Sequence, residues 1–174
     1  MNNAIVLTNG LLKALDAKTA HGLIRGTERF TIKGVVDCAA TAGQDAGTLL
    51  DGKNRNIPVF ENLGAAISSL TDIQFLVIGV ATVGGKLPAN MLTTIIEAIH
   101  TGLSIVNGLH EYLNEKPEIV ALAKEKGVQL IDVRKPKTRE QLSFWTGDIY
   151  KVKAPIIAVI GMTAPWVKEL LLEC

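Results

Sequence analysis

The chain has 174 residues, enough for one domain with a full hydrophobic core and too few for two ordinary domains. Apolar residues make up 48% and charged residues 20%, which is typical of globular proteins and excludes a disordered chain. The net charge of +1 gives no indication of nucleic-acid or anionic-membrane binding.

The cysteines and the first residues predict a cytoplasmic protein. Cys38 and Cys174 do not form the framework of a disulfide-rich protein, so a reducing compartment is expected. The start, M-N-N-A-I-V-L, has neither the basic flank nor the apolar run of a signal peptide. No apolar run approaches the roughly 18 residues needed to cross a bilayer, so we expect no membrane partner.

Short apolar runs alternate with segments that have helical spacing or loop composition. The predicted strands, in chain order, are 4–7, 30–37, 57–60, a run beginning at Phe75, 104–106, 128–133 and 156–160. The predicted helices are part of 13–26 with breaks at Gly22 and Gly26, a turn within 43–52, 64–70 capped by Asn62, 91–102, 109–114 and 117–126.

This alternation predicts an α/β fold, a Rossmann-like and largely parallel sheet with helices on both faces. The run from Phe75, F-L-V-I-G-V-A, is apolar almost throughout, as expected of a central strand buried on both faces. It leads into a loop with Gly84 and Gly85, and Pro88 then begins a helix. Because ligands of open α/β sheets bind outside the carboxyl ends of the strands, we expect a site at this edge.

The turn after the first strand argues against NAD. A dinucleotide site requires G-x-G-x-x-G there, whereas T-N-G-L-L-K-A carries a single glycine. Asp37, at the end of the second strand, is a candidate for binding a ribose, and a surface carboxylate is the alternative.

Two clusters of polar side chains are candidate site residues. In K-T-A-H-G-L-I-R, a helix would place Lys18, His21 and Arg25 on one face, with the Thr19 hydroxyl nearby. Such a face suits a phosphate or carboxylate, and a solvated basic face is the alternative.

The second cluster, N-G-L-H-E, follows the fifth predicted strand and includes Gly108 and His110. Histidine beside Glu111 is a candidate acid or base, and a helix-capping histidine is the alternative. The three histidines lack metal-ligand spacing, so no metal is predicted.

Several motifs together resemble one family. They are K-T-A-H-G-L-I-R, V-V-D, I-G-V-A-T-V-G-G-K-L-P, A-I-H-T-G-L-S-I-V-N-G-L-H-E-Y-L and I-D-V-R. In this order they resemble the N-terminal half of D-glutamate N-acetyltransferase-like proteins, the domain of unknown function 1611 family, often mislabelled as NAD-dependent epimerases. The resemblance implies a Rossmann-like domain, a following P-loop-type domain, and acetyl transfer from acetyl-CoA to D-glutamate. P-V-F-E-N-L-G-A-A-I also resembles, more distantly, the CoA-binding domain of succinyl-CoA ligases.

The chain departs from this family near its end. We interpret 1–153 as the Rossmann-like domain and 154–161 as the first strand of a P-loop-type domain that is otherwise missing. We interpret residues 162–174 as an atypical, frame-shifted tail. If one base is inserted after the Met162 codon, the shifted reading frame permits the sequence G-M-D-C-A-V-G-K-R-T-T, which is like the P-loop segment of the family. A genuine helix starting at Pro165 is the alternative.

The function predicted from this resemblance is an acetyl-CoA-dependent D-amino-acid N-acetyltransferase domain that is inactive alone. His110 is the candidate base, and backbone groups at Gly84, Gly85 and Gly108 are candidates for holding ligand oxygens. A non-catalytic module that binds CoA or a nucleotide, or that mediates oligomerisation, is the alternative, and an NAD-dependent oxidoreductase is the third choice. The expected partners are a small-molecule ligand and a second copy of the chain.

Overall fold

The computed structural model describes residues 2–142 and 145–153. The chain divides into two compact units, 1–136 and 137–174, and the first holds the sheet. The predicted strand at 156–160, the P-loop segment and the atypical tail lie outside the described residues.

Six parallel strands form the sheet, in the order β3-β2-β1-β4-β5-β6. They are β1 (Asn2–Leu7), β2 (Phe30–Val36), β3 (Val59–Phe60), β4 (Phe75–Ile78), β5 (Ser104–Asn107) and β6 (Leu130–Asp132). This is the strand order of Rossmann dinucleotide-binding domains, in which the winding direction reverses between β1 and β4. The predicted α/β, Rossmann-like fold is confirmed.

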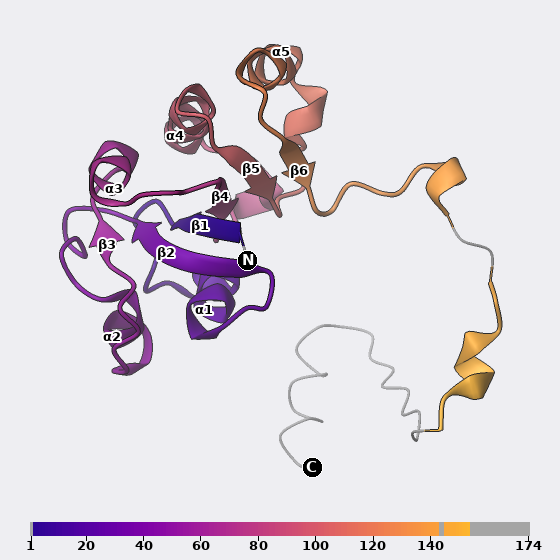
Figure 1. Cartoon of the computed structure of the whole chain (residues 1–174), viewed down its shortest axis with the longest axis horizontal. Coiled ribbons are helices and arrows are strands. Elements are labelled where there is room, and N and C mark those ends of the chain that lie inside the picture. The colour runs from indigo at the N-terminus through magenta and orange to yellow at the C-terminus, as the bar shows by residue number, and fades with distance from the viewer. Residues whose placement is uncertain (1, 143–144, 154–174) are drawn as a thin grey trace. The chain divides into compact units, whose positions relative to one another are not determined.

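Helices cover both faces of the sheet. They are α1 (Lys18–Arg25), α2 (Ala46–Asp51), α3 (Leu63–Ser69), α4 (Ala89–His100) and α5 (Pro117–Lys126), with 3₁₀ turns η1 (Leu15–Ala17), η2 (Val83–Gly85) and η3 (Leu113–Glu115). Helices α1 and α2 lie on one face, and α3, α4 and α5 lie on the other (Figure 1). Asn62 caps α3 as predicted, because its side-chain oxygen accepts a hydrogen bond from the Ala65 N–H at 2.9 Å.

Two local predictions were wrong. Gly22 lies inside α1 and does not break it, whereas Gly26 does end it. The helix expected over 109–114 is absent, and η3 is its only helical remnant within the described chain. The reason is that the N–H groups of residues 109–111 donate to acceptors at Asn107 and Gly85, outside any helix.

The core centres on β1 and β4. Residues 4–7 of β1 are at most 1% exposed, as expected for a strand covered on both faces. Gly79, just after β4, permits α1 to approach closely, since a Cβ there would lie 2.5 Å from Val6 Cγ1 and 2.8 Å from Ala20 Cβ. The Gly79 carbonyl accepts a hydrogen bond from the Ala20 N–H at 2.8 Å. The first turn of α1 is therefore fixed at the carboxyl end of β4.

The second unit contributes two further 3₁₀ turns to the described residues, η4 (Arg139–Gln141) and η5 (Asp148–Lys151). Thr138 and Gln141 form a reciprocal capping box around η4. Trp145, three residues before η5, packs its ring edge to face against that of Tyr150 in η5, with centroids 5.5 Å apart.

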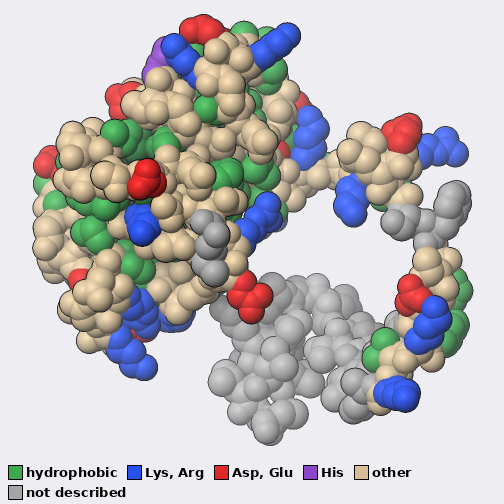
Figure 2. All heavy atoms as spheres, in the orientation of Figure 1, with side chains coloured by type: hydrophobic (Ala, Val, Ile, Leu, Met, Phe, Trp, Pro, Cys, Tyr) green, Lys and Arg blue, Asp and Glu red, His purple; other side chains and the backbone are tan. Residues whose placement is uncertain are grey.

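Within the described residues, no helix is long and apolar enough to span a membrane. On the face seen in Figure 2, acidic and basic side chains of the first unit are interspersed with apolar and uncharged groups. That mixture agrees with the nearly balanced total charge.

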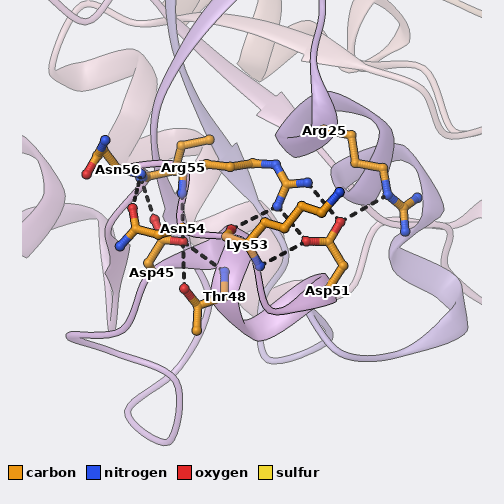
Figure 3. A network of polar contacts seen from close by, with 9 residues as sticks. Arg25, Asp45, Thr48, Asp51, Lys53, Asn54, Arg55 and Asn56 are labelled. Carbon is orange, nitrogen blue, oxygen red and sulfur yellow. Dashed lines mark hydrogen bonds and ion pairs between the residues drawn. The ribbon is translucent and has the colours of Figure 1, made fainter.

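Two carboxylates organise the connection from α2 to β3 (Figure 3). Asp45 accepts hydrogen bonds from the backbone N–H groups of Thr48, Arg55 and Ile57, at 2.8 to 3.1 Å. Asp51 pairs with two nitrogens of the Arg55 guanidinium, at 2.7 and 2.8 Å. The Arg55 hydrogen bond, opposed by partial burial, lowers the pKa of Asp51 from 3.8 to about 2.

The lowered pKa of Asp51 predicts a pH-dependent contribution to stability. Because the folded state favours the ionised carboxylate, its contribution is full above pH 3.8 and is lost as the pH falls towards 2. We expect Asp51→Asn to lower the melting temperature at pH 6, and the difference from wild type to shrink steadily between pH 4 and about 2. Calorimetric melting across this range checks the prediction, and a constant difference would contradict it.

Candidate functional site

A pocket of about 480 Å³ opens at the carboxyl edge of the sheet, where the ends of β4, β5 and β6 meet the start of α1. Its polar side chains are Thr19, Thr82, His110 and Arg134, and its apolar side chains are Ile78, Val80, Ala81 and Leu109. The glycines Gly84, Gly85 and Gly108 complete the lining. Since β4 lies beside β1, where the winding reverses, this is the position at which open α/β folds bind ligands.

The loop from β4 to α4 forms one wall. The Gly85 N–H donates to the Thr82 carbonyl at 2.9 Å, and the Thr82 hydroxyl donates to the carbonyl of Lys86. Gly84 and Gly85 both adopt left-handed backbone conformations, with φ of 65° and 66°. The G-G pair is therefore needed for a tight turn that few other residues adopt.

This loop is joined to the loop that carries His110. The Gly85 carbonyl accepts hydrogen bonds from the N–H groups of both His110 and Glu111, at 3.1 and 3.0 Å. The Glu111 carboxylate in turn accepts from the Leu87 N–H at 2.7 Å and pairs with Lys116 at 2.6 Å. The Lys116 ammonium, and then the Leu87 N–H, hold the pKa of Glu111 below its usual range. The two loops thus form one hydrogen-bonded unit.

Asn107 and Asp132, at the ends of β5 and β6, hold this unit in place through hydrogen bonds. The fully buried Asn107 amide donates to the Glu111 carbonyl and to Asp132, both at 2.8 Å. Asp132 also accepts from the backbone N–H groups of Leu113 and Asn114. Burial raises the pKa of Asp132, but the donors of Asn114, Asn107 and Leu113 outweigh it and hold the pKa below its usual value.

His110 and Arg134 form the polar side of the pocket. The Arg134 Nη1 lies 3.3 Å from the His110 Nε2. Because a guanidinium only donates hydrogen bonds, Nε2 must accept, and the imidazole proton lies on Nδ1 in this arrangement. Among the residues that the structure describes, neither aspartate nor glutamate lines the pocket. Its charge therefore suits an anionic ligand.

The side chains of the predicted cationic face of α1 do not share one site in the structure. Thr19 lines the pocket, but His21 Nε2 contacts the Leu12 carbonyl at 2.6 Å and closes the loop after β1. Arg25, in the last turn of α1, pairs with Asp51 of α2 at 3.7 Å (Figure 3). Lys18 is exposed and does not line the pocket. The expected joint anion site of Lys18, His21 and Arg25 is thus not assembled, since each side chain has a separate environment.

Asp37 is engaged inside the protein. It is 6% exposed, and its carboxylate accepts hydrogen bonds from the hydroxyls of Thr8 and Thr41, both at 2.7 Å, and from the Leu12 N–H at 3.0 Å. These bonds fix the loop between β1 and α1. A ribose hydroxyl at Asp37 would have to compete with these donors for a largely buried carboxylate.

The backbone donors predicted at the glycine loop are also partly occupied. The N–H groups of Gly85 and His110 donate within the protein, as described above, and the Leu109 N–H donates to Asn107. The available donors include the side chains of Thr19 and Arg134. Within the described ranges, no group of three metal-binding side chains comes together.

Arg134 was missed as a site residue. Asp132, two residues before it, bonds to the Asn107 side chain and the Leu113 N–H, whereas the Arg134 side chain reaches His110. Its position two residues after the end of a parallel strand was the signal, because all such ends meet at one edge.

Comparison with known proteins agrees with the Rossmann-like fold. Residues 39–136, more than half of the chain, match a domain of unknown function described as the DUF1611_N Rossmann-like domain. The chain belongs to the DUF1611_N family. A crystal structure of a DUF1611 family protein from Anabaena variabilis matches with a TM-score of 0.70 and 31% identity, over 80% of this chain and 39% of that one.

Two curated relatives are named D-glutamate N-acetyltransferase. The protein from Pseudoalteromonas is 39% identical over 85 residues, and that from Tritonibacter scottomollicae is 38% identical over 64 residues. These matches cover 49% and 37% of this chain, but only 24% and 19% of the relatives. The chain thus matches about a quarter or less of their length.

The contact between Gly85 and His110 predicts a graded effect of two substitutions. A Cβ at Gly85 would lie 2.6 Å from His110 Cδ2, whereas one at Gly84 would meet nothing within 4 Å. Alanine at either position would have to adopt the left-handed backbone conformation, which destabilises the folded state by about 1–2 kcal/mol. We expect Gly84→Ala to show that cost alone and Gly85→Ala to lose additional stability and shift the His110 ring signals. Denaturant unfolding and NMR test this, and equal effects of the two variants would contradict it.

Proposed function

We propose that this chain provides the Rossmann-like part of an acetyl-CoA-dependent D-amino-acid N-acetyltransferase, and that its ligand binds in the carboxyl-edge pocket. The observation that carries the proposal is the pocket itself, at the carboxyl edge of the sheet, whose described lining contains His110 and Arg134 and no carboxylate. The two relatives named D-glutamate N-acetyltransferase support the reaction class.

The proposed reaction requires an uncharged amine. The amine nitrogen attacks the thioester carbonyl carbon, the C–S bond then breaks, and CoA leaves as a thiolate that takes up the proton lost by the attacking nitrogen. A base must first remove the ammonium proton, and hydrogen-bond donors must stabilise the oxyanion of the intermediate. His110 is the candidate base, because its imidazole lines the pocket and is held there by the backbone bond to Gly85. Its Nε2 can take up the proton only when the Arg134 guanidinium turns from it to the ligand.

The structure of the loop after β1 argues against binding of NAD at the usual dinucleotide position. The Rossmann strand order alone is compatible with either, but the loop after β1 has one glycine and is closed by its bonds to Asp37 and His21. The approach that a pyrophosphate makes in dinucleotide-binding folds would require opening this loop. The acetyl transfer of a whole protein further depends, in this proposal, on residues that the relatives have beyond the matched region.

Calorimetry with acetyl-CoA, CoA and NAD tests the proposal. We expect heat of binding with the CoA species and none with NAD. Tight NAD binding would contradict the proposal in favour of an oxidoreductase, and binding of none of the three would favour an interaction module.

Gly108→Leu supplies the matched test of location. Gly108 lines the pocket, a Cβ there would meet nothing within 4 Å, and its backbone is not in the left-handed region. A leucine should therefore fill the pocket without disturbing the fold, and weaken CoA binding by at least about tenfold. Gly22→Leu, on the exposed side of α1, is the control and should bind like wild type. Unchanged binding by Gly108→Leu would place the ligand elsewhere.

A further inference from the structure

We infer that Arg134 is the oxyanion-recognition residue of the pocket, binding a carboxylate or phosphate group of the ligand through its guanidinium. This inference rests on the proposed function only in regarding the carboxyl-edge pocket as the ligand site. It adds the chemical class of the group bound and the residue that selects it.

The first argument is that the guanidinium has donors to spare. Ion pairs among the described residues engage Arg25, Arg55, Lys116, Lys126, Lys135 and Lys151, but not Arg134. The Arg134 side chain contacts only His110 Nε2, at 3.3 Å, among its described polar partners. Since a guanidinium carries five N–H donors in a planar fork, several remain for a bidentate oxyanion.

The second argument is that nearby carboxylates are already satisfied. Glu111 is paired with Lys116 and bonded to the Leu87 N–H, and it does not line the pocket, although it lines a neighbouring cavity with His110. Asp132 accepts hydrogen bonds from Asn107, Leu113 and Asn114. The positive charge of Arg134 is therefore directed to the pocket without a neutralising partner within it.

The third argument is that the backbone of Arg134 is held independently of its side chain. The Tyr112 hydroxyl donates to the Arg134 carbonyl at 3.3 Å, and the Lys135 N–H donates to the Asp132 carbonyl at 3.1 Å. A substitution of the exposed Arg134 side chain should thus leave the fold intact. An oxyanion bound there would also lie beside the His110 imidazole, which would fix the remainder of the ligand relative to the candidate base.

Simple anions separate the two sources of the oxyanion. Glutarate presents carboxylates like those of an acidic amino acid, and pyrophosphate presents the phosphate chemistry of CoA. Each is titrated into wild type at constant ionic strength while the Gly108 amide signal is followed by NMR, since salt screens exposed charges. We expect at least one of the two to bind, and Arg134→Gln to weaken it by about tenfold to hundredfold. Arg134→Lys, which keeps the charge but loses the fork, should give an intermediate loss.

Lys135→Gln is the matched control. It removes the same charge one residue away, at a side chain that pairs with Glu115 and does not line the pocket. If Arg134→Gln loses binding of glutarate alone, the subsite binds carboxylates. If it loses binding of pyrophosphate alone, the subsite binds phosphates. The inference is overturned if neither anion binds wild type, if Arg134→Gln binds like wild type, or if Lys135→Gln loses as much. Neither probe contains a thioester or an amine, so this result is independent of whether CoA binds.

Discussion

The structure of the site depends on one carbonyl group. The Gly85 oxygen accepts hydrogen bonds from the N–H groups of His110 and Glu111, and so joins the loop after β4 to the loop after β5. Glycine is required at this position by its left-handed backbone, and because a Cβ there would lie only 2.6 Å from His110 Cδ2. The position of His110 is therefore set by the loop that forms the opposite wall of the pocket.

The pocket has a positive character because the nearby carboxylates are paired with other groups. Carboxylates around it bond to lysine or to backbone and amide donors, which keeps them ionised but directs them into the protein framework. Arg134 is the charged lining side chain that lacks such a partner in the described part of the chain. A site that binds anions can thus arise in a protein whose net charge is only +1, because it depends on the distribution of charges and not on their sum.

The sequence predicts the sheet well because parallel strands buried on both faces are continuous apolar runs, as in F-L-V-I of β4. It also places Gly84, Gly85, Gly108 and His110 at one edge, since the carboxyl ends of parallel strands meet there. The hydrogen-bond partners of the individual polar side chains were less predictable. His21 and Asp37 bond to the loop after β1, a loop whose path no periodicity reveals. Arg134 was not predicted as a site residue, because the hydrogen bonds of Asp132 to Leu113 and Asn114, which leave Arg134 without this nearby carboxylate, cannot be read from spacing.

The central claim is that the carboxyl-edge pocket, and not the dinucleotide position beside Asp37, binds the ligand. A crystal structure of the chain with acetyl-CoA tests this most directly. The account predicts density for part of the ligand between the Gly84–Gly85 turn, His110 and Arg134, with the hydrogen bonds of Asp37 intact. Acetyl-CoA bound at the loop between β1 and α1, with those bonds broken, would contradict it.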